Sequence, residues 1–264
     1  MSKEDAKRDY NEQESYVREE GPLNGLTTFN SEYGYLEAML RGFRSGFLRE
    51  YEYRQLCQCT TLEDVKLSFG DTDFSLVLQA QNHLTPDIIV EKCWEKHVNE
   101  FQFIREQAVG TLSTFLDFIT YETLIENISF LIKGLINEAD PSELWEKCNS
   151  FGLFSGLKTI LTFENSGEGL LELYRTVLVD TPVAPYFEKY FSSSLRSDEP
   201  LNQMERTYKE VEFDVIANTI QKLWLEDFYK YTQELGGATA EIMKELLEFE
   251  ADRKALAITI NSYV

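Results

Sequence analysis

The sequence predicts an all-α protein, and three observations carry that prediction. Helix start signals recur ahead of segments whose apolar residues repeat about every 3.6 positions. No segment of comparable length shows the strict alternation of apolar and polar residues that is typical of a strand. One segment, Thr111 to Gly134, is apolar around most of a helix circumference, as expected of a helix wrapped by others. We therefore expect several helical bundles packed into one body.

The start signals place the helices along the chain. Each combines an N-capping side chain with a glutamate or a proline in the first turn, where backbone N–H groups have no helical partner. They are Thr60 with Glu63, Thr85 with Pro86, and Asp140 with Pro141 and Glu143. The glycines of the segment Gly34 to Leu48 match no phosphate-binding loop, so we expect them to end a helix or let it pack closely. Gly236 and Gly237 predict the end of one late helix, and Thr239 predicts the cap of the next.

Two stretches interrupt this helical pattern. Residues 1–28 are dominated by charged and amide side chains, a composition that buries too little apolar surface to offset ordering. We predict that they form an acidic, flexible extension and that residues 29–264 form the helical domain. A second break is expected at Phe191 to Gln203, where serines, an aspartate and a proline replace the apolar periodicity.

Charge and composition exclude several classes of function. The formal net charge of -21 repels phosphate backbones and anionic lipid, so we expect no nucleic-acid partner and, if charge selects partners, basic ones. The four cysteines lack the spacing of a disulfide scaffold and the N-terminus lacks a signal peptide, which indicates a reducing, cytosolic compartment. The most apolar run, Ile128 to Ile136, is far shorter than the roughly 20 residues that cross a bilayer, so no direct membrane insertion is expected.

Potential metal sites are few, because the chain has only two histidines. Cys93, His97 and Glu100 share helical spacing and could converge on a metal ion. The competing interpretation, which we favour, is that Cys93 and His97 continue an apolar stripe with Phe101 and Ile104, so that His97 is a core residue. We accordingly predict no bound metal and no cofactor.

Two further patterns are also weak evidence for a metal or redox site. Cys57 and Cys59 are separated by one residue, which fits neither a zinc pair nor a redox motif. Glu122 and Glu126 lie one helical turn apart and resemble half of a di-iron carboxylate site. No Glu-x-x-His motif accompanies them, so a solvated or salt-bridged helix face is the better interpretation.

The last segment, Leu247 to Val264, combines a charged cluster with an apolar stripe. On a helical wheel one face carries six residues: Ile242, Leu246, Phe249, Arg253, Leu256 and Ile260. This pattern predicts that Arg253 points into an apolar interface, where its guanidinium needs a carboxylate partner. Glu250 lies three residues from Arg253 and four from Lys254, close enough for pairing. We favour a structural ion-pair network over a catalytic pair of carboxylates, although perturbed charge clusters arise in both settings.

Five ordered blocks of this sequence resemble the d subunit family of V-type proton ATPases, whose prokaryotic relatives are C subunits. They are FNSEYGYLEAMLRGFRSGFL (Phe29 to Leu48), CTTLEDVKLSFGDTDFSLVL (Cys59 to Leu78), FLDFITYETLIENISFLIKG (Phe115 to Gly134), LYRTVLVDTPVAPYFEKYF (Leu173 to Phe191) and WLEDFYKYTQELGGATAEIMKELLEFEADRKALAITINS (Trp224 to Ser262). No single block is diagnostic, but their order and spacing together are specific.

The sequence also departs from the family pattern. Glu32-Tyr33 stands where family members usually carry Asp-Asn, and the acidic extension is additional. Family members continue past the equivalent of Val264 into a helical region with a Trp-Ile-Ala-Glu-Cys-like motif. We therefore expect a fragment, a truncated gene model or a short paralogue, with a C-terminally incomplete fold.

The resemblance implies a non-catalytic role. In the family, a funnel-like body of repeated helical bundles joins the proteolipid c-ring to central stalk subunits D and F, with subunit a as a further candidate neighbour. It sits on the cytoplasmic face of vacuolar, endosomal or lysosomal membranes. Structural or coupling roles are expected for four residues: Phe115, Asp180, Asp252 and Arg253. The alternatives are a short paralogue acting as an assembly or regulatory scaffold and, behind both, an enzyme built on the carboxylate cluster.

Overall fold

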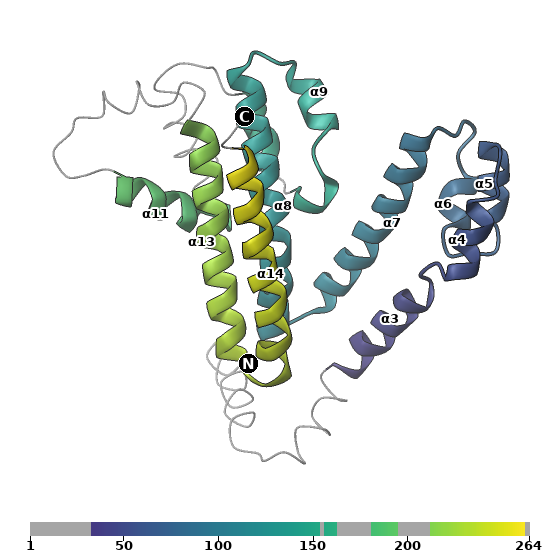
Figure 1. The fold of residues 1–264 in the computed structure, drawn as a ribbon, viewed down its shortest axis with the longest axis horizontal. Coiled ribbons are helices and arrows are strands. Elements are labelled where there is room, and N and C mark those ends of the chain that lie inside the picture. Colours follow the sequence, from purple (N-terminus) through teal and green to yellow (C-terminus); the bar gives the residue numbers. More distant parts are fainter. Residues whose placement is uncertain (1–32, 154–155, 163–180, 195–211, 262–264) are drawn as a thin grey trace, which may run out of the picture. The chain divides into compact units, whose positions relative to one another are not determined.

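The protein is described by a computed structural model covering residues 33–153, 156–162, 181–194 and 212–261. All regular secondary structure in these residues is helical, which confirms the predicted all-α class. The backbone divides after Ala108 into two units, each with its own packing (Figure 1). The predicted acidic extension, residues 1–28, lies outside the described residues.

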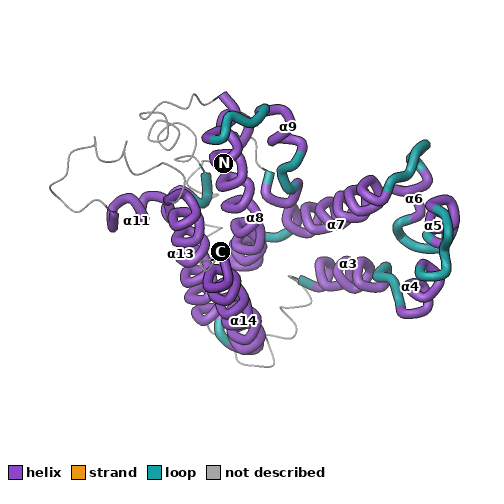
Figure 2. Tube along the Cα trace, turned by 45° about the horizontal axis from the view of Figure 1, so that its top comes forward, coloured by secondary structure: helices purple, strands orange, loops and turns teal. Residues whose placement is uncertain are grey.

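The first unit is built from short helices that connect two longer ones. These are α3 (Gly34–Ser45), α4 (Glu50–Leu56), α5 (Leu62–Ser68), α6 (Ser75–Gln79) and α7 (Pro86–Gln107), drawn as a tube in Figure 2. Helix α7 packs against both α3 and α6. Leu78, Val98 and Ile104 are almost fully buried in this packing. The rings of Phe43 and Phe103 meet edge to face, with 6.3 Å between centroids, and tie α3 to α7.

The N-terminal caps of two helices in the first unit can be compared with the predictions, and one cap lies one residue later than predicted. The Thr85 hydroxyl accepts the Ile88 N–H and Pro86 occupies the first helical position, as predicted. The capping box of α5 is formed by Thr61 and Asp64, so the prediction of Thr60 with Glu63 is one residue too early. Asp64 accepts N–H bonds from both threonines, and this geometry favours the later pair.

The second unit is a bundle of three long helices with shorter segments on its side. The long helices are α8 (Gly110–Ile136), α13 (Glu212–Leu235) and α14 (Gly237–Asn261). Beside them lie α9 (Pro141–Glu146), α11 (Ala184–Ser194) and the 3-10 helices η1 (Ser150–Gly152) and η2 (Leu157–Thr162). Helix α13 contacts α8, α11 and α14, as Figure 1 shows from one side.

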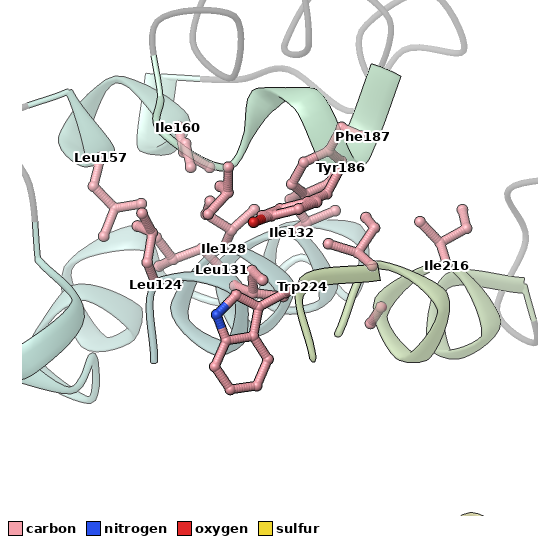
Figure 3. Packing of buried hydrophobic residues seen from close by; sticks show 14 of the residues in the cluster. Leu124, Ile128, Leu131, Ile132, Leu157, Ile160, Tyr186, Phe187, Ile216 and Trp224 are labelled. Atoms are coloured by element: carbon pink, nitrogen blue, oxygen red, sulfur yellow. The ribbon is translucent and has the colours of Figure 1, made fainter. Parts of the chain in front are cut away.

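Helix α8 is covered on several sides, as its apolar circumference predicted. It contacts α9, η1, η2 and α13, and Ile125, Ile128 and Leu131 have no accessible surface. In Figure 3 the side chains of Leu157 and Ile160 from η2, Tyr186 and Phe187 from α11, and Trp224 from α13 surround this core. None of the helices in the described ranges is both long and apolar enough to cross a membrane.

Two predicted boundaries in the second unit need correction, and one is confirmed. Asp140 caps α9 by accepting the N–H groups of Ser142 and Glu143, as predicted. Helix α14 begins at Gly237, so Thr239 lies inside the first turn and does not cap it. Gly236 and Gly237, between the end of α13 and the start of α14, have φ values of +69° and +56°, a left-handed conformation that glycine adopts without strain. Helix α11 continues to Ser194, so the predicted break at Phe191 starts too early.

Candidate functional site

The strongest candidate site is a cluster of charged side chains between the three long helices, centred on Lys254. The Lys254 ammonium lies 2.7 Å from Glu122 Oε1 of α8 and 3.5 Å from Glu250 Oε1 of its own helix. It also donates a longer hydrogen bond, 3.4 Å, to Gln221 Oε1 of α13. Only 16% of the Lys254 side chain is exposed, so the charge depends on these partners for the solvation it has lost.

The position of Lys254 follows from the spacing of α14. Leu247, Glu250 and Lys254 are separated by three and four residues and therefore share one face of the helix. Leu247 is buried in the main core, and Met243 packs against the same core one turn earlier. The face that holds Leu247 against the bundle consequently carries Lys254 toward α8.

Arg253 lies at the outer edge of this cluster. Its Nε donates to Glu250 Oε2 at 2.8 Å, and its Nη2 donates a shorter bond to Glu250 Oε1. The side chain is 56% exposed, so the prediction that Arg253 points into an apolar interface is wrong. The wheel grouped the stripe correctly, but it is the neighbouring face, with Leu247, that meets the bundle. The predicted pairing of Glu250 with both basic residues is confirmed.

The pKa values of two carboxyl groups in the cluster are shifted in opposite directions. The hydrogen bond from Arg253 holds the pKa of Glu250 below its ordinary value, in spite of partial burial. The pKa of Glu126 is raised, first because neighbouring atoms desolvate its carboxyl group and then because of the nearby Glu122 charge. More than a third of Glu126 nevertheless stays accessible, so this shift is moderated by solvent.

Below the cluster, aromatic rings join α8 to α13. Phe118 stacks on Phe228 with centroids 5.1 Å apart, and Phe115 meets the same ring edge to face at 5.6 Å. The indole Nε1 of Trp224 donates a buried hydrogen bond of 2.9 Å to the Phe118 carbonyl. At the lower end, the Tyr231 hydroxyl donates to the Thr111 carbonyl at 2.8 Å. Phe115 is therefore part of a packed seam between two helices.

The predicted coupling residues are not gathered in one place. Phe115 lies in the aromatic seam, Arg253 lies at the edge of the charged cluster, and Asp252 is exposed on the outer surface of α14. Asp180 lies outside the described residues. Sequence reasoning missed the central pair, Lys254 with Glu122, although the spacing of Lys254 from Leu247 could have indicated its direction.

The alternative metal and redox sites can be compared with their observed surroundings. His97 is 57% exposed, so the prediction of a core histidine is wrong, and its Nδ1 lies 3.9 Å from Glu100. In the part of the chain that the structure describes, no three His, Cys, Asp or Glu side chains are grouped closely enough to hold a metal ion. Glu122 is bound by Lys254, in agreement with the prediction of a salt-bridged face. All four cysteines are free.

Comparison with known proteins identifies close sequence relatives. A family described as ATP synthase (C/AC39) subunit matches residues 36–264. The chain is 45% identical over 240 residues to "V-type proton ATPase subunit d" of Dictyostelium discoideum, which covers 90% of this chain and 63% of that protein. It is 44% identical over 236 residues to "V-type proton ATPase subunit d1" of Arabidopsis thaliana, covering 89% of this chain and 63% of the relative. It is 38% identical over 237 residues to "V-type proton ATPase subunit d" of Saccharomyces cerevisiae, covering 89% and 64%. The chain thus spans less than two thirds of the length of these relatives.

Proposed function

Because the chain belongs to the ATP synthase (C/AC39) subunit family, we propose that it is a non-catalytic rotor subunit of a V-type proton ATPase. In this role it couples the central stalk to the membrane proteolipid c-ring during ATP-driven proton transport. The observation that carries the proposal is the family match over residues 36–264, together with relatives named as subunit d at 35% to 45% identity.

The proposed partners follow from that role. The c-ring lies on the membrane side, central stalk subunits D and F lie on the other, and subunit a is a further neighbour. The protein would be held peripherally, through the complex, at the cytoplasmic face of vacuolar, endosomal or lysosomal membranes. ATP hydrolysis and proton transfer would take place on other subunits.

The bundle of the second unit supports a mechanical role. Helices α8, α13 and α14 contain 27, 24 and 25 residues, which corresponds to lengths of about 36 to 40 Å at 1.5 Å per residue. Side chains bond α8 to α13 at successive levels, from Tyr231 with Thr111, through Trp224 with Phe118, to an ion pair between Lys133 and Asp214. Helices bonded at several levels resist sliding past one another, which is what the transmission of torque requires.

The charged residues divide into two groups with different proposed tasks. Lys254 and Glu122 form a partly buried ion pair that ties α14 to α8. Asp252 and Arg253 lie on the outer surface, where a coupling role would depend on contacts with a neighbouring subunit. A loss of coupling without a loss of stability is therefore expected only for the second group.

Complementation tests the proposal directly. The tagged chain is expressed in cells lacking their own subunit d, the membrane complexes are purified through the tag, and ATP hydrolysis and proton transport are measured in vesicles. We expect recovery of c-ring and stalk subunits and restoration of both activities. Recovery of assembly intermediates without proton transport would instead favour the scaffold alternative. Recovery of no pump subunit would exclude both.

A further inference from the structure

Two threonines in this sequence are followed directly by proline, Thr85 before Pro86 and Thr181 before Pro182, and no serine is. A serine or threonine before proline is the minimal sequence that proline-directed protein kinases phosphorylate. So short a motif also occurs by chance, so its structural surroundings decide whether a kinase can use it. The two threonines differ in those surroundings.

Thr85 lies on an accessible, extended segment between α6 and α7. Thr85, Pro86 and Asp87 are all exposed, and residues 81–84 before them belong to no helix. The φ and ψ angles of Thr85 are -123° and 160°, the extended conformation to which a following proline ring restricts a residue. A kinase binds the residues around its acceptor hydroxyl in an extended form, so the backbone of Thr85 already has the required conformation.

The Thr85 hydroxyl caps α7, and this contact leaves it able to react. Its oxygen accepts the Ile88 N–H at 3.2 Å, which occupies one of the two lone pairs. A kinase also contacts residues after the threonine, so the first turn of α7 has to open when the kinase binds. Helix ends fray readily, and Pro86 has no N–H group whose hydrogen bond could be lost.

Thr181 carries the same motif in a closed setting. Only 5% of Thr181 is exposed, and Val183, two residues later, is completely buried in the main core. A phosphate group at this position would carry about 1.5 to 2 negative charges into apolar surroundings, at a high cost in lost solvation. The folded chain therefore provides its own control, with one accessible and one buried threonine before proline.

We propose that Thr85 is a phosphorylation site for a proline-directed protein kinase and that folding protects Thr181. In the reaction the Thr85 Oγ1 attacks the γ-phosphorus of ATP, and the bond from that phosphorus to the oxygen of the leaving ADP breaks. The hydroxyl proton passes to the catalytic aspartate of the kinase, so the products are phosphothreonine and ADP. The inference stands on the segment before α7 and holds whether or not the chain acts in a proton pump.

A phosphate group at Thr85 is compatible with the fold. It would lie at the N-terminal end of a 22-residue helix, where its oxygens can accept the N–H groups of the first turn. Its negative charge also interacts favourably with the helix dipole, although Asp87 in the first turn opposes part of this effect. Phosphorylation at Thr85 therefore preserves the start of α7, whereas phosphorylation at Thr181 would disrupt the core.

Phosphorylation of the full folded chain tests the proposal. The chain is incubated with an active mitogen-activated protein kinase and Mg-ATP, and the modified residues are located and quantified by mass spectrometry. Synthetic peptides with the sequences of residues 80–91 and 176–187 give the rates without a fold. We expect Thr85 in the chain to react within about tenfold of its peptide, and Thr181 about a hundredfold or more slower than its peptide, because only the buried site needs extensive opening.

Variants of the same chain separate the motif from the cap. Thr85→Ser should keep the modification, Thr85→Val should abolish it, and Thr181→Val should leave it unchanged. Pro86→Ala keeps the capping threonine and should lower the rate at Thr85 by about tenfold or more, because the kinase loses its proline contact. Absence of phosphate on Thr85 in the folded chain would show that the hydroxyl serves only as a cap and would overturn the proposal. Equal protection of Thr85 and Thr181, relative to their peptides, would refute it as well.

Discussion

Two adjacent basic residues on α14 provide a sharp test of the charged cluster. Lys254 is 16% exposed and bonded across helices, whereas Arg253 is 56% exposed and, within the described ranges, bonded only to Glu250 of its own helix. We expect Lys254→Met to lower the stability of the protein substantially and Arg253→Met to leave the melting temperature nearly unchanged. Methionine suits both positions because it keeps an unbranched stem of similar length and removes the charge.

The size of the Lys254 effect follows from the bonds that are lost. A hydrogen bond between charged groups contributes about 1.5 to 3 kcal/mol, and the Lys254 to Glu122 bond is short and partly buried. Part of this loss is offset, because the methionine variant avoids the free-energy cost of removing an ammonium group from water. Glu250 keeps Arg253, but Glu122 loses its bond from Lys254. A net cost of about 2 kcal/mol corresponds to a fall of about 4 to 8 °C in the melting temperature of a domain of this size.

Differential scanning calorimetry of both variants, at neutral pH and moderate salt, measures the difference in their melting temperatures. A double-mutant cycle between Lys254→Met and Glu122→Gln should give a coupling free energy above about 0.5 kcal/mol. Equal melting temperatures for the two single variants, or a larger fall for Arg253→Met, would refute the assignment of Lys254 as the internal residue.

Three further predictions concern other parts of the structure. Glu126→Gln should raise stability at pH 7 to 8, because the raised pKa of Glu126 means that its ionised form is disfavoured in the folded state. In thermal melts at falling pH, this advantage should disappear as the wild-type carboxyl group becomes protonated. A variant that is less stable than the wild type at pH 7 would contradict the prediction. Gly42→Ala should stabilise the protein by about 0.5 to 1 kcal/mol, since a Cβ at this helical position meets nothing within 4 Å. Gly152→Ala should destabilise the protein, since its Cβ would lie 2.5 Å from the Thr123 backbone. Chemical denaturation of both variants tests this, and equal changes in the free energy of unfolding would contradict the packing. Trp224→Phe should lower the free energy of unfolding by about 2 kcal/mol, because it removes the buried hydrogen bond to the Phe118 carbonyl and part of the indole volume. A melting temperature equal to that of the wild type would show that this bond contributes nothing.

Sequence patterns predicted those features that depend on local chemistry. The starts at Thr85 and Asp140 were predictable because a capping side chain and a proline act within one turn. The burial of α8 was predictable because its apolar residues cover most of its circumference. At the start of α5 two threonines precede two acidic residues, so spacing alone could not separate Thr60 with Glu63 from Thr61 with Asp64.

The charged cluster was only partly predictable, because α14 has two faces with apolar residues. Periodicity groups residues by face but does not say which face meets the rest of the protein. The more apolar stripe, with Phe249 and Leu256, is exposed, and the face with Leu247 is buried. Only tertiary packing distinguishes them, so Arg253 was assigned to the interior in place of its neighbour Lys254.

The order of the long helices along the chain has a consequence for synthesis. Helix α8 is made first, yet its bonds to α13 join residues separated by 106 and 120 positions, while α13 and α14 meet across 33 positions. The α13–α14 hairpin can therefore close with a small loss of chain entropy, whereas the contacts of α8 with α13 close a much longer loop. At roughly 5 to 20 residues per second, a ribosome exposes this apolar helix for on the order of 5 to 20 s before its partner emerges. During that interval the segments that can cover α8 are α9, η1 and η2, which follow it directly in the chain.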